Sequence, residues 1–147
     1  ATAPETVSSM EERAIEHKAF TVLDKSYGDA NTFARYGVMY WDTVLHIGIK
    51  DKDQLKEVQT NLATALKTDS AIALIVVGET KYSQNDYFEL QNEAINYFIA
   101  LEGPDKVVSA VVDAPKNRLI LTVTEASAKT AYAFLDKFGD TVVLNVK

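Results

Sequence analysis

The sequence predicts an α+β protein in which one α-β-β-α-β unit occurs twice in tandem, with small, mainly antiparallel sheets backed by helices. Two observations support this class. Apolar residues recur at spacings of three and four in some segments and alternate with polar residues in others, the patterns of amphipathic helices and half-buried strands. The order of these segments in residues 1–80 recurs in residues 81–147 at a period of roughly 70 to 74 residues, which is typical of a duplicated small domain.

The first unit begins with a helix and a hairpin. The apolar positions of the helix are Ile15, Ala19, Val22 and Leu23. Gly28 and Asp29 end this pattern, and residues 37–41 and 44–49 then form two strands around a turn. Because strand side chains alternate between two faces, we expect one face of the second strand to be buried. The residues of that face are Leu45, Ile47 and Ile49.

A second helix and a closing strand complete the first unit. Asp51 or Asp53 caps the helix, since a side-chain oxygen there accepts from the first free backbone N–H groups. Its apolar stripe is Leu55, Val58, Leu62 and Leu66. Residues 71–77 are apolar at every position, which predicts an internal strand buried on both faces, and Gly78 closes the unit.

The second unit repeats this order. Asn85 or Asp86 caps a helix that runs to Leu101 and ends at Gly103, and a strand through Val107 to Val112 follows. Residues 113–117 turn the chain, and the returning strand has an apolar face at Leu119, Leu121 and Val123. An acidic residue, Glu125, stands where Asp51 stands in the first unit. The next helix has an apolar stripe at Ala128, Ala131, Tyr132, Leu135 and Phe138. A last strand covers residues 142–146.

Composition excludes several classes of function. Fifteen Lys and Arg against 21 Asp and Glu give a net charge of −6, and no basic cluster occurs. We therefore expect no nucleic-acid partner and no binding to an anionic membrane, because both need a positive face. The absence of cysteine excludes thiolate catalysis and disulfides. No motif for a metal or cofactor is present, so we expect neither.

Catalysis is not expected either. The two histidines, His17 and His46, lie on different predicted elements, and no serine nucleophile motif accompanies them. A catalytic histidine needs an orienting group at one nitrogen and a nucleophile at the other. A small enzyme or ligand binder that uses His46 with nearby acids stays an alternative.

Aromatic residues gather in two places, the first hairpin and the central helix. The hairpin group is Tyr36, Tyr40 and Trp41, and the helix group is Tyr82, Tyr87, Phe88, Tyr97 and Phe98. Core packing explains both groups, and a partner surface is the second interpretation, because Tyr and Trp are enriched among interface anchors. The sequence leaves the two interpretations open.

The start of the chain bears on location. Residues 1–6, Ala-Thr-Ala-Pro-Glu-Thr, are typical of a mature end produced by signal-peptide removal, so we expect a secreted protein.

Two segments resemble one known family. Residues 36–49 are similar to the strand-turn-strand signature of the pro-regions of alpha-lytic protease and streptogrisin-class secreted serine proteases, and residues 108–125 resemble the second such signature. The resemblance extends from the first helix to Val146. It implies a foldase and inhibitor of a serine protease, whose C-terminal sheet lies beside a hairpin of the protease. The partner-binding residues that it implies are Val142, Val143, Leu144, Asn145, Val146 and Lys147.

An alternative keeps the fold and changes the role. Only Lys147 follows the last strand, so we expect the tail that the family places in the protease active site to be short or absent. A stand-alone extracellular module that binds another protein would need no such tail, and this second hypothesis stays open beside the first.

Overall fold

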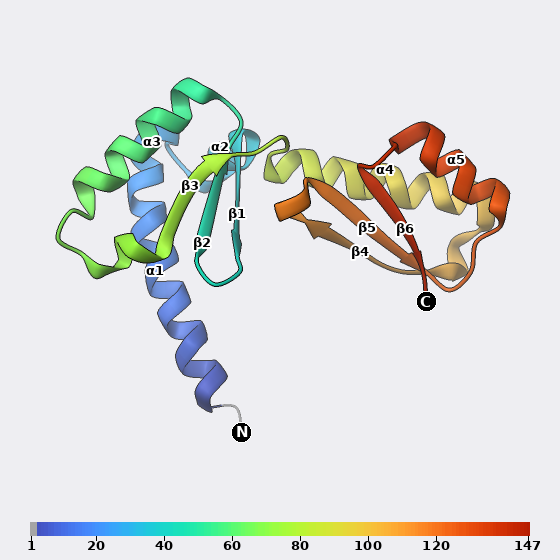
Figure 1. Ribbon diagram of the computed structural model, residues 1–147, viewed down its shortest axis with the longest axis horizontal. Helices are drawn as coiled ribbons and strands as arrows, with labels where there is room; N and C mark the ends of the chain where they lie inside the picture. The colour runs from blue at the N-terminus through green and yellow to red at the C-terminus, as the bar shows by residue number, and fades with distance from the viewer. Residues whose placement is uncertain (1–2) are drawn as a thin grey trace. The chain divides into compact units, whose positions relative to one another are not determined.

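The computed structural model describes the backbone of residues 3–147 and the side chains of residues 10–147. Ala1 and Thr2, part of the segment behind the export prediction, lie outside the described residues. The chain divides between Gln84 and Asn85 into two units, each with its own sheet (Figure 1). Helices and two small mixed sheets make the protein α+β, as predicted.

The first unit places two covering helices on a three-stranded sheet of order β1-β2-β3. Its elements are α1 (Ala3–Tyr27), α2 (Ala30–Tyr36), β1 (Gly37–Trp41), β2 (Leu45–Ile49), α3 (Lys52–Ala65), a 3₁₀ helix η1 (Ser70–Leu74) and β3 (Ile75–Glu79). The predicted inner face of β2 is confirmed, since Leu45, Ile47 and Ile49 are fully buried. They pack with residues of α1 and α3, among them Leu23 and Leu62. The N-cap of α3 is Asp51, which accepts from the N–H groups of Asp53 and Gln54.

Two predictions for the first unit are wrong. Residues 30–36 form the helix α2, capped by Asp29, where the sequence indicated only the end of the first helix. Residues 71–77 are not one internal strand. Asp69 caps the 3₁₀ helix by accepting from Ala71, so the strand starts only at Ile75, and it lies at the edge of the sheet with Val76 46% exposed.

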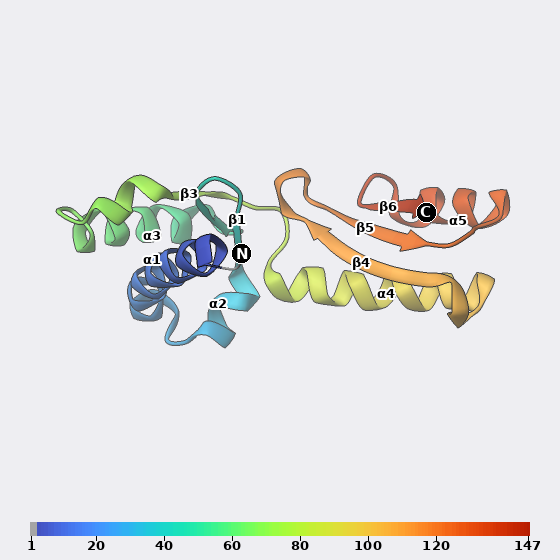
Figure 2. The same cartoon turned by 90° about the horizontal axis from the view of Figure 1, so that it is seen from below.

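The second unit has a sheet of order β4-β5-β6. Its elements are α4 (Gln84–Glu102), the 3₁₀ helices η2 (Pro104–Lys106) and η3 (Ala114–Lys116), and β4 (Val107–Asp113), β5 (Arg118–Val123), α5 (Ala128–Phe138) and β6 (Val142–Val146). Figure 2 shows α4 lying along β4, where Gln91 Nε2 donates to the carbonyl of Ala110. Fully buried Leu119, Leu121 and Val123 meet Phe98 of α4 and Phe134 of α5, so both helices cover the same face.

The helix starts of the second unit differ from prediction. The helix α4 begins at Gln84, so Asn85 and Asp86 lie in its first turn rather than at its cap. The N-cap of α5 is Ser127, whose side chain accepts from Thr130 N, whereas Glu125 instead pairs with Lys106 Nζ at 3.1 Å.

The predicted apolar stripe of α5 lies on the wrong side of the helix. Ala128, Ala131, Tyr132 and Leu135 are exposed, and the buried residues are Thr130 and Phe134. Phe138 alone of the predicted stripe packs against the core. Phe134, Phe138, Ala131, Leu135, Ala128 and Tyr132 follow one another around one broad apolar arc of this helix, so periodicity alone does not select which flank of the arc faces inward.

The two units share one topology. In each, the first two strands pair antiparallel and the third pairs parallel to the second, which is central. Each sheet is therefore mixed: one ladder is antiparallel, as expected, and the other is parallel because its two strands are joined through a helix. Common descent of the two units stays a prediction. Within the described residues, no helix combines the length and apolar character needed to cross a membrane.

The core of the second unit gives a first prediction. Leu121 is central in β5 and fully buried, so Leu121→Ala should lower the free energy of unfolding by about 2–5 kcal/mol through lost burial and a cavity. Denaturant unfolding followed by far-ultraviolet circular dichroism measures this. Thr122→Ala, one residue along on the opposite face, is the control, and an equal effect of both changes would contradict the assigned faces.

Candidate functional site

The edge strand β6 has backbone groups directed away from its sheet. Leu119 N donates to Thr141 O, and Lys147 N donates to Val123 O, so the odd-numbered residues of this stretch bond to β5. Because a parallel ladder uses alternate residues, the N–H and C=O groups of Val142, Leu144 and Val146 point to the other side. Within the described residues the sheet ends there. An extended segment of another chain could bond to these groups.

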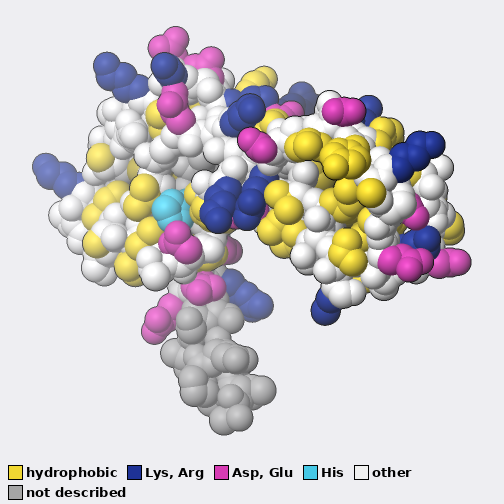
Figure 3. All heavy atoms as spheres, turned by 45° about the vertical axis from the view of Figure 1, so that its right-hand side comes forward, with side chains coloured by type: hydrophobic (Ala, Val, Ile, Leu, Met, Phe, Trp, Pro, Cys, Tyr) yellow, Lys and Arg dark blue, Asp and Glu magenta, His cyan; other side chains and the backbone are white. Residues whose placement is uncertain are grey.

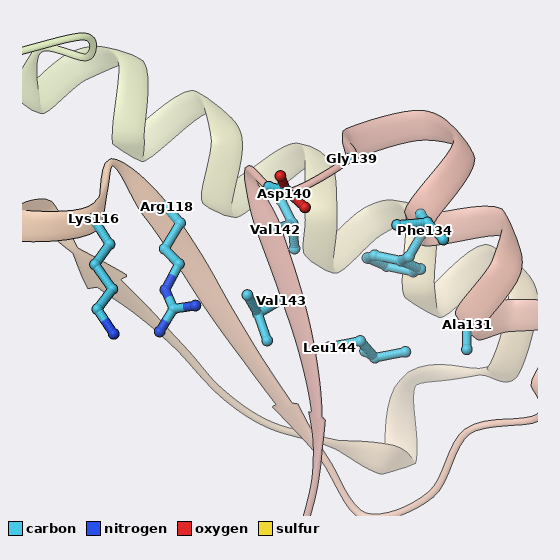
Figure 4. Close-up of a pocket in the computed structure, with 10 residues that line it drawn as sticks. Lys116, Arg118, Ala131, Phe134, Gly139, Asp140, Val142, Val143 and Leu144 are labelled. Carbon is cyan, nitrogen blue, oxygen red and sulfur yellow. The ribbon is translucent and has the colours of Figure 1, made fainter.

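A groove of about 510 Å³ lies at β6. In Figure 4, Ala131 and Phe134 of α5 lie on one side and Lys116 and Arg118 lie on the other, and Leu135 of α5 also belongs to the lining. Val142, Val143 and Leu144 of β6 lie between them, and Gly139 and Asp140 complete the lining. The groove therefore joins an apolar wall, a strand edge and two basic side chains.

The residues predicted to bind a partner all lie in or directly after β6. Val142 is buried, Val143 and Leu144 are half-buried, and Asn145, Val146 and Lys147 are exposed. Asn145 Nδ2 donates to Thr122 Oγ1 of β5 at 3.3 Å on the face that carries no helix. The predicted set thus forms one edge, and the inward side chain of Val142 anchors it to the core.

The corresponding edge of the first unit, β3, is partly blocked. By the same ladder geometry, the carbonyl of Val77 points away from β2, and Gln59 Nε2 of α3 donates to it at 3.2 Å. Gln59 lies eight residues beyond the N-cap Asp51. Leu135 lies eight residues beyond the N-cap Ser127. An apolar side chain thus stands in the second unit where a hydrogen-bonding amide covers the strand edge in the first.

The other exposed residues of α5 also differ from their counterparts in α3. Ala128 and Tyr132 occupy the positions that Lys52 and Lys56 occupy in α3, counted from the two N-caps. Tyr132 is 70% exposed and Leu135 is 58% exposed. The alignment is supported by the buried residues Val58 and Phe134, which are both seven positions beyond their caps. Figure 3 shows hydrophobic side chains gathered on the visible face of the second unit, at the right of the view.

No family model, curated protein or solved structure matches this chain. The site is therefore interpreted from its own geometry.

A carboxylate network fixes the start of α5, and with it the wall of the groove. Glu102 Oε2 accepts from Ser127 N at 2.8 Å and from Thr130 Oγ1 at 2.6 Å, and Glu102 Oε1 lies 3.2 Å from Lys106 Nζ. The Glu102 side chain is 11% exposed. The hydroxyl of Thr130, the N–H of Ser127 and the ammonium of Lys106 all favour the ionised form, and they lower the pKa of Glu102 to about 2.

His46 has a structural environment. Its Nε2 lies 2.9 Å from Asp42 Oδ2, and its ring stacks on Tyr40 at 4.8 Å between centroids. The N–H of Val44 contributes most to lowering the pKa of Asp42, and His46 contributes less. The other histidine, His17, is exposed on α1. These contacts make His46 part of a cross-strand stack on the open face of the first sheet.

Most of the predicted aromatic groups serve packing. Tyr36 stacks on Tyr27, and Trp41 Nε1 donates to Glu16 Oε1 at 2.6 Å. Tyr97 and Phe98 contact Phe134. In contrast, Phe88 is 62% exposed. The sequence interpretation missed the exposure of Tyr132 and Leu135, and an alignment of the caps Asp51 and Ser127 would have revealed it.

The Glu102 network makes a prediction for acid conditions. The pKa of Glu102 is depressed in the folded protein, so its stabilising effect is present above the unfolded value of 4.5 and is lost as pH falls toward about 2. Glu102→Gln should therefore lower the melting temperature at pH 7. It should also reduce the fall in melting temperature that the unchanged protein shows between pH 4.5 and about pH 2. Thermal unfolding across this range measures both effects. Glu89→Gln, which changes an exposed residue of α4, should leave the profile as in the unchanged protein, and a steep decline retained by Glu102→Gln would contradict the assignment.

Proposed function

We propose that this protein is a non-catalytic binding module that takes an extended segment of a partner protein as a fourth strand beside β6. The observation that carries this proposal is the difference between two equivalent edges. Gln59 covers the outward carbonyl of Val77 in β3, whereas exposed Leu135 borders the groove at β6. Strand addition of this kind uses main-chain hydrogen bonds for affinity and alternate side-chain contacts for selectivity.

The energy of such binding comes from two sources. Each new backbone hydrogen bond contributes about 0.5–1.5 kcal/mol net, and β6 offers outward groups at three residues. Burial of the Leu135 side chain adds about 1.5–3 kcal/mol if it becomes fully covered. The sum is offset by the cost of ordering the bound segment, so a single edge supports moderate affinity.

The resemblance to protease pro-regions suggests the class of partner. We propose a secreted serine protease as this partner, with the chain acting outside the cell as its inhibitor or foldase through the β6 edge. In support, the residues that the resemblance assigns to binding form the edge strand beside the groove. The second candidate is a stand-alone extracellular module with another protein partner, which the same edge would serve equally well.

A change of Leu135 to the residue type found at position 59 tests strand addition. Leu135→Gln introduces the amide found in the first unit and removes apolar contact, so it should weaken partner binding by about tenfold or more. Partners are first selected from a library of random extended peptides, and binding is measured by calorimetry. Amide hydrogen exchange should show new protection at Leu144 and Val146 in the complex.

The matched control is Ala63→Gln, a change of the same kind at an exposed position of α3. It should leave affinity unchanged. Binding without protection of β6 amides, or binding that Leu135→Gln does not weaken, would show that partners use another surface.

The protease hypothesis has its own test. Micromolar protein is added to a panel of chymotrypsin-like serine proteases, and both residual activity and recovery from denaturant are followed. At least one protease should be inhibited or refold faster, and Leu135→Gln should reduce that effect because it changes the β6 edge. If every protease is unaffected while selected peptides still bind β6, the stand-alone module is the better account.

A further inference from the structure

The two sides of the β6 edge differ in chemistry. The side chains of Val142 and Leu144 share the helix-covered face with Leu119 and Leu121, and Ala131 and Leu135 of α5 border the groove on that side. Val143 shares the opposite, open face with Ile120. Side chains of an added strand would alternate in the same way. One set would therefore meet apolar groups of α5, and the other set would lie over the open face.

Two basic side chains, Lys116 and Arg118, line the groove on the side of the open face. Arg118, at the start of β5, uses its Nε to donate to Asp113 Oδ2 at 2.7 Å, so its charge is partly balanced. Lys116 is exposed and has no ion-pair partner among the described residues. In Figure 4 the nitrogen-bearing ends of Lys116 and Arg118 lie near each other in projection on the Val143 side of the groove.

The first unit has no cation at the corresponding place. Arg118 precedes Leu119 as Val44 precedes Leu45, and the tight turn there contains Asp42 and Thr43 instead of the 3₁₀ helix that ends at Lys116. Among the described residues, a basic pair therefore precedes the central strand of the second sheet, whereas Val44 and the turn residues Asp42 and Thr43 precede that of the first. In the first sheet, Gln59 donates to the closing strand β3, and Leu135 stands at the matching position beside β6.

We infer that the partner segment is an extended peptide with alternating apolar and acidic side chains. This inference rests on the proposed strand addition at β6. In this arrangement the apolar side chains cover Leu135, Ala131 and Leu144, and the carboxylates lie on the open face and attract the basic side chains of Lys116 and Arg118, which also line the groove. Exposed ion pairs contribute little each, so the charges select among partners and the apolar contacts and backbone bonds provide most of the affinity.

One carboxylate opposes this arrangement locally. Asp140 also lines the groove, next to Gly139 in the turn that enters β6. Figure 4 shows it close to Val142 in the upper middle of the view, whereas the ends of Lys116 and Arg118 lie lower and to the left. An acidic side chain of the bound segment is therefore favoured near Lys116 and Arg118 and disfavoured beside Asp140. This difference favours one register of the bound segment over the others.

The test uses three seven-residue peptides with valine at alternate positions and Glu, Gln or Lys at the others. The Glu peptide should bind the full chain about two- to fivefold more tightly than the Gln peptide, and the Lys peptide should bind most weakly. The difference should shrink as salt rises toward 1 M. Affinity is measured by calorimetry, and protection of the Leu144 and Val146 amides locates each complex.

Charge reversal at the groove is compared with the same reversal elsewhere. Lys116→Glu should reverse the order of the Glu and Lys peptides. Lys129→Glu, which changes the net charge equally at a residue of α5 outside the groove lining, should preserve the order. Circular dichroism confirms that each variant is folded.

The outcomes separate two failures. If no peptide binds or protects β6 amides, strand addition itself is wrong. If peptides bind at β6 without regard to charge, or if both reversals act alike, the acidic preference is wrong and strand addition stands. A concentration-dependent dimer that protects Leu144 and Val146 and that peptides do not dissociate would make a second copy of this chain the occupant and overturn the inference.

Discussion

The parallel return of the last strand in each unit is the constraint on which the candidate site depends. A strand parallel to its neighbour must be reached through a crossover, here α3 before β3 and α5 before β6. The crossover helix packs on one face and leaves the closing strand at an edge with alternate backbone groups directed outward. The side chain that the helix presents to that edge then determines whether the edge is covered. In this chain Gln59 covers the edge of β3 with a hydrogen bond, whereas Leu135 lines the groove beside β6.

An exposed apolar helix face beside a strand edge is a feature that natural proteins generally avoid, because together they favour aggregation. The first unit avoids it with Lys52, Lys56 and Gln59 on the outer side of α3. The second unit presents Ala128, Tyr132 and Leu135 instead. Since both helices have the same place in the same topology, the fold itself does not require the apolar face. The binding of a partner segment that we propose would explain why it is present.

Sequence patterns predicted the class, the strand order along the chain and the buried faces of β2 and β5. Apolar residues recur at every second position in residues 45–49 and 119–123, and such a period of two is typical of a strand with one buried face. They placed the candidate site at β6 through a resemblance, and they missed its apolar wall. In α5 the apolar arc is broad, and the predicted stripe through Ala131, Tyr132 and Leu135 is its exposed flank, whereas Phe134 lies on the buried one. The position of β3 at an edge depends on strand pairing, which a local apolar run does not encode.

The Glu102 network explains how an exposed apolar face is held in place without being buried. Packing of α5 rests on few inward residues, chiefly Phe134, so the orientation of the helix depends also on its first turn. Glu102 holds that turn through the N–H of Ser127 and the hydroxyl of Thr130, and it ties the end of α4 to the start of α5. A charge-assisted anchor of this kind has a defined direction, which apolar packing lacks. The polar contact at the start of α5 therefore acts together with the packing of Phe134 to support the outward position of Leu135 beside β6.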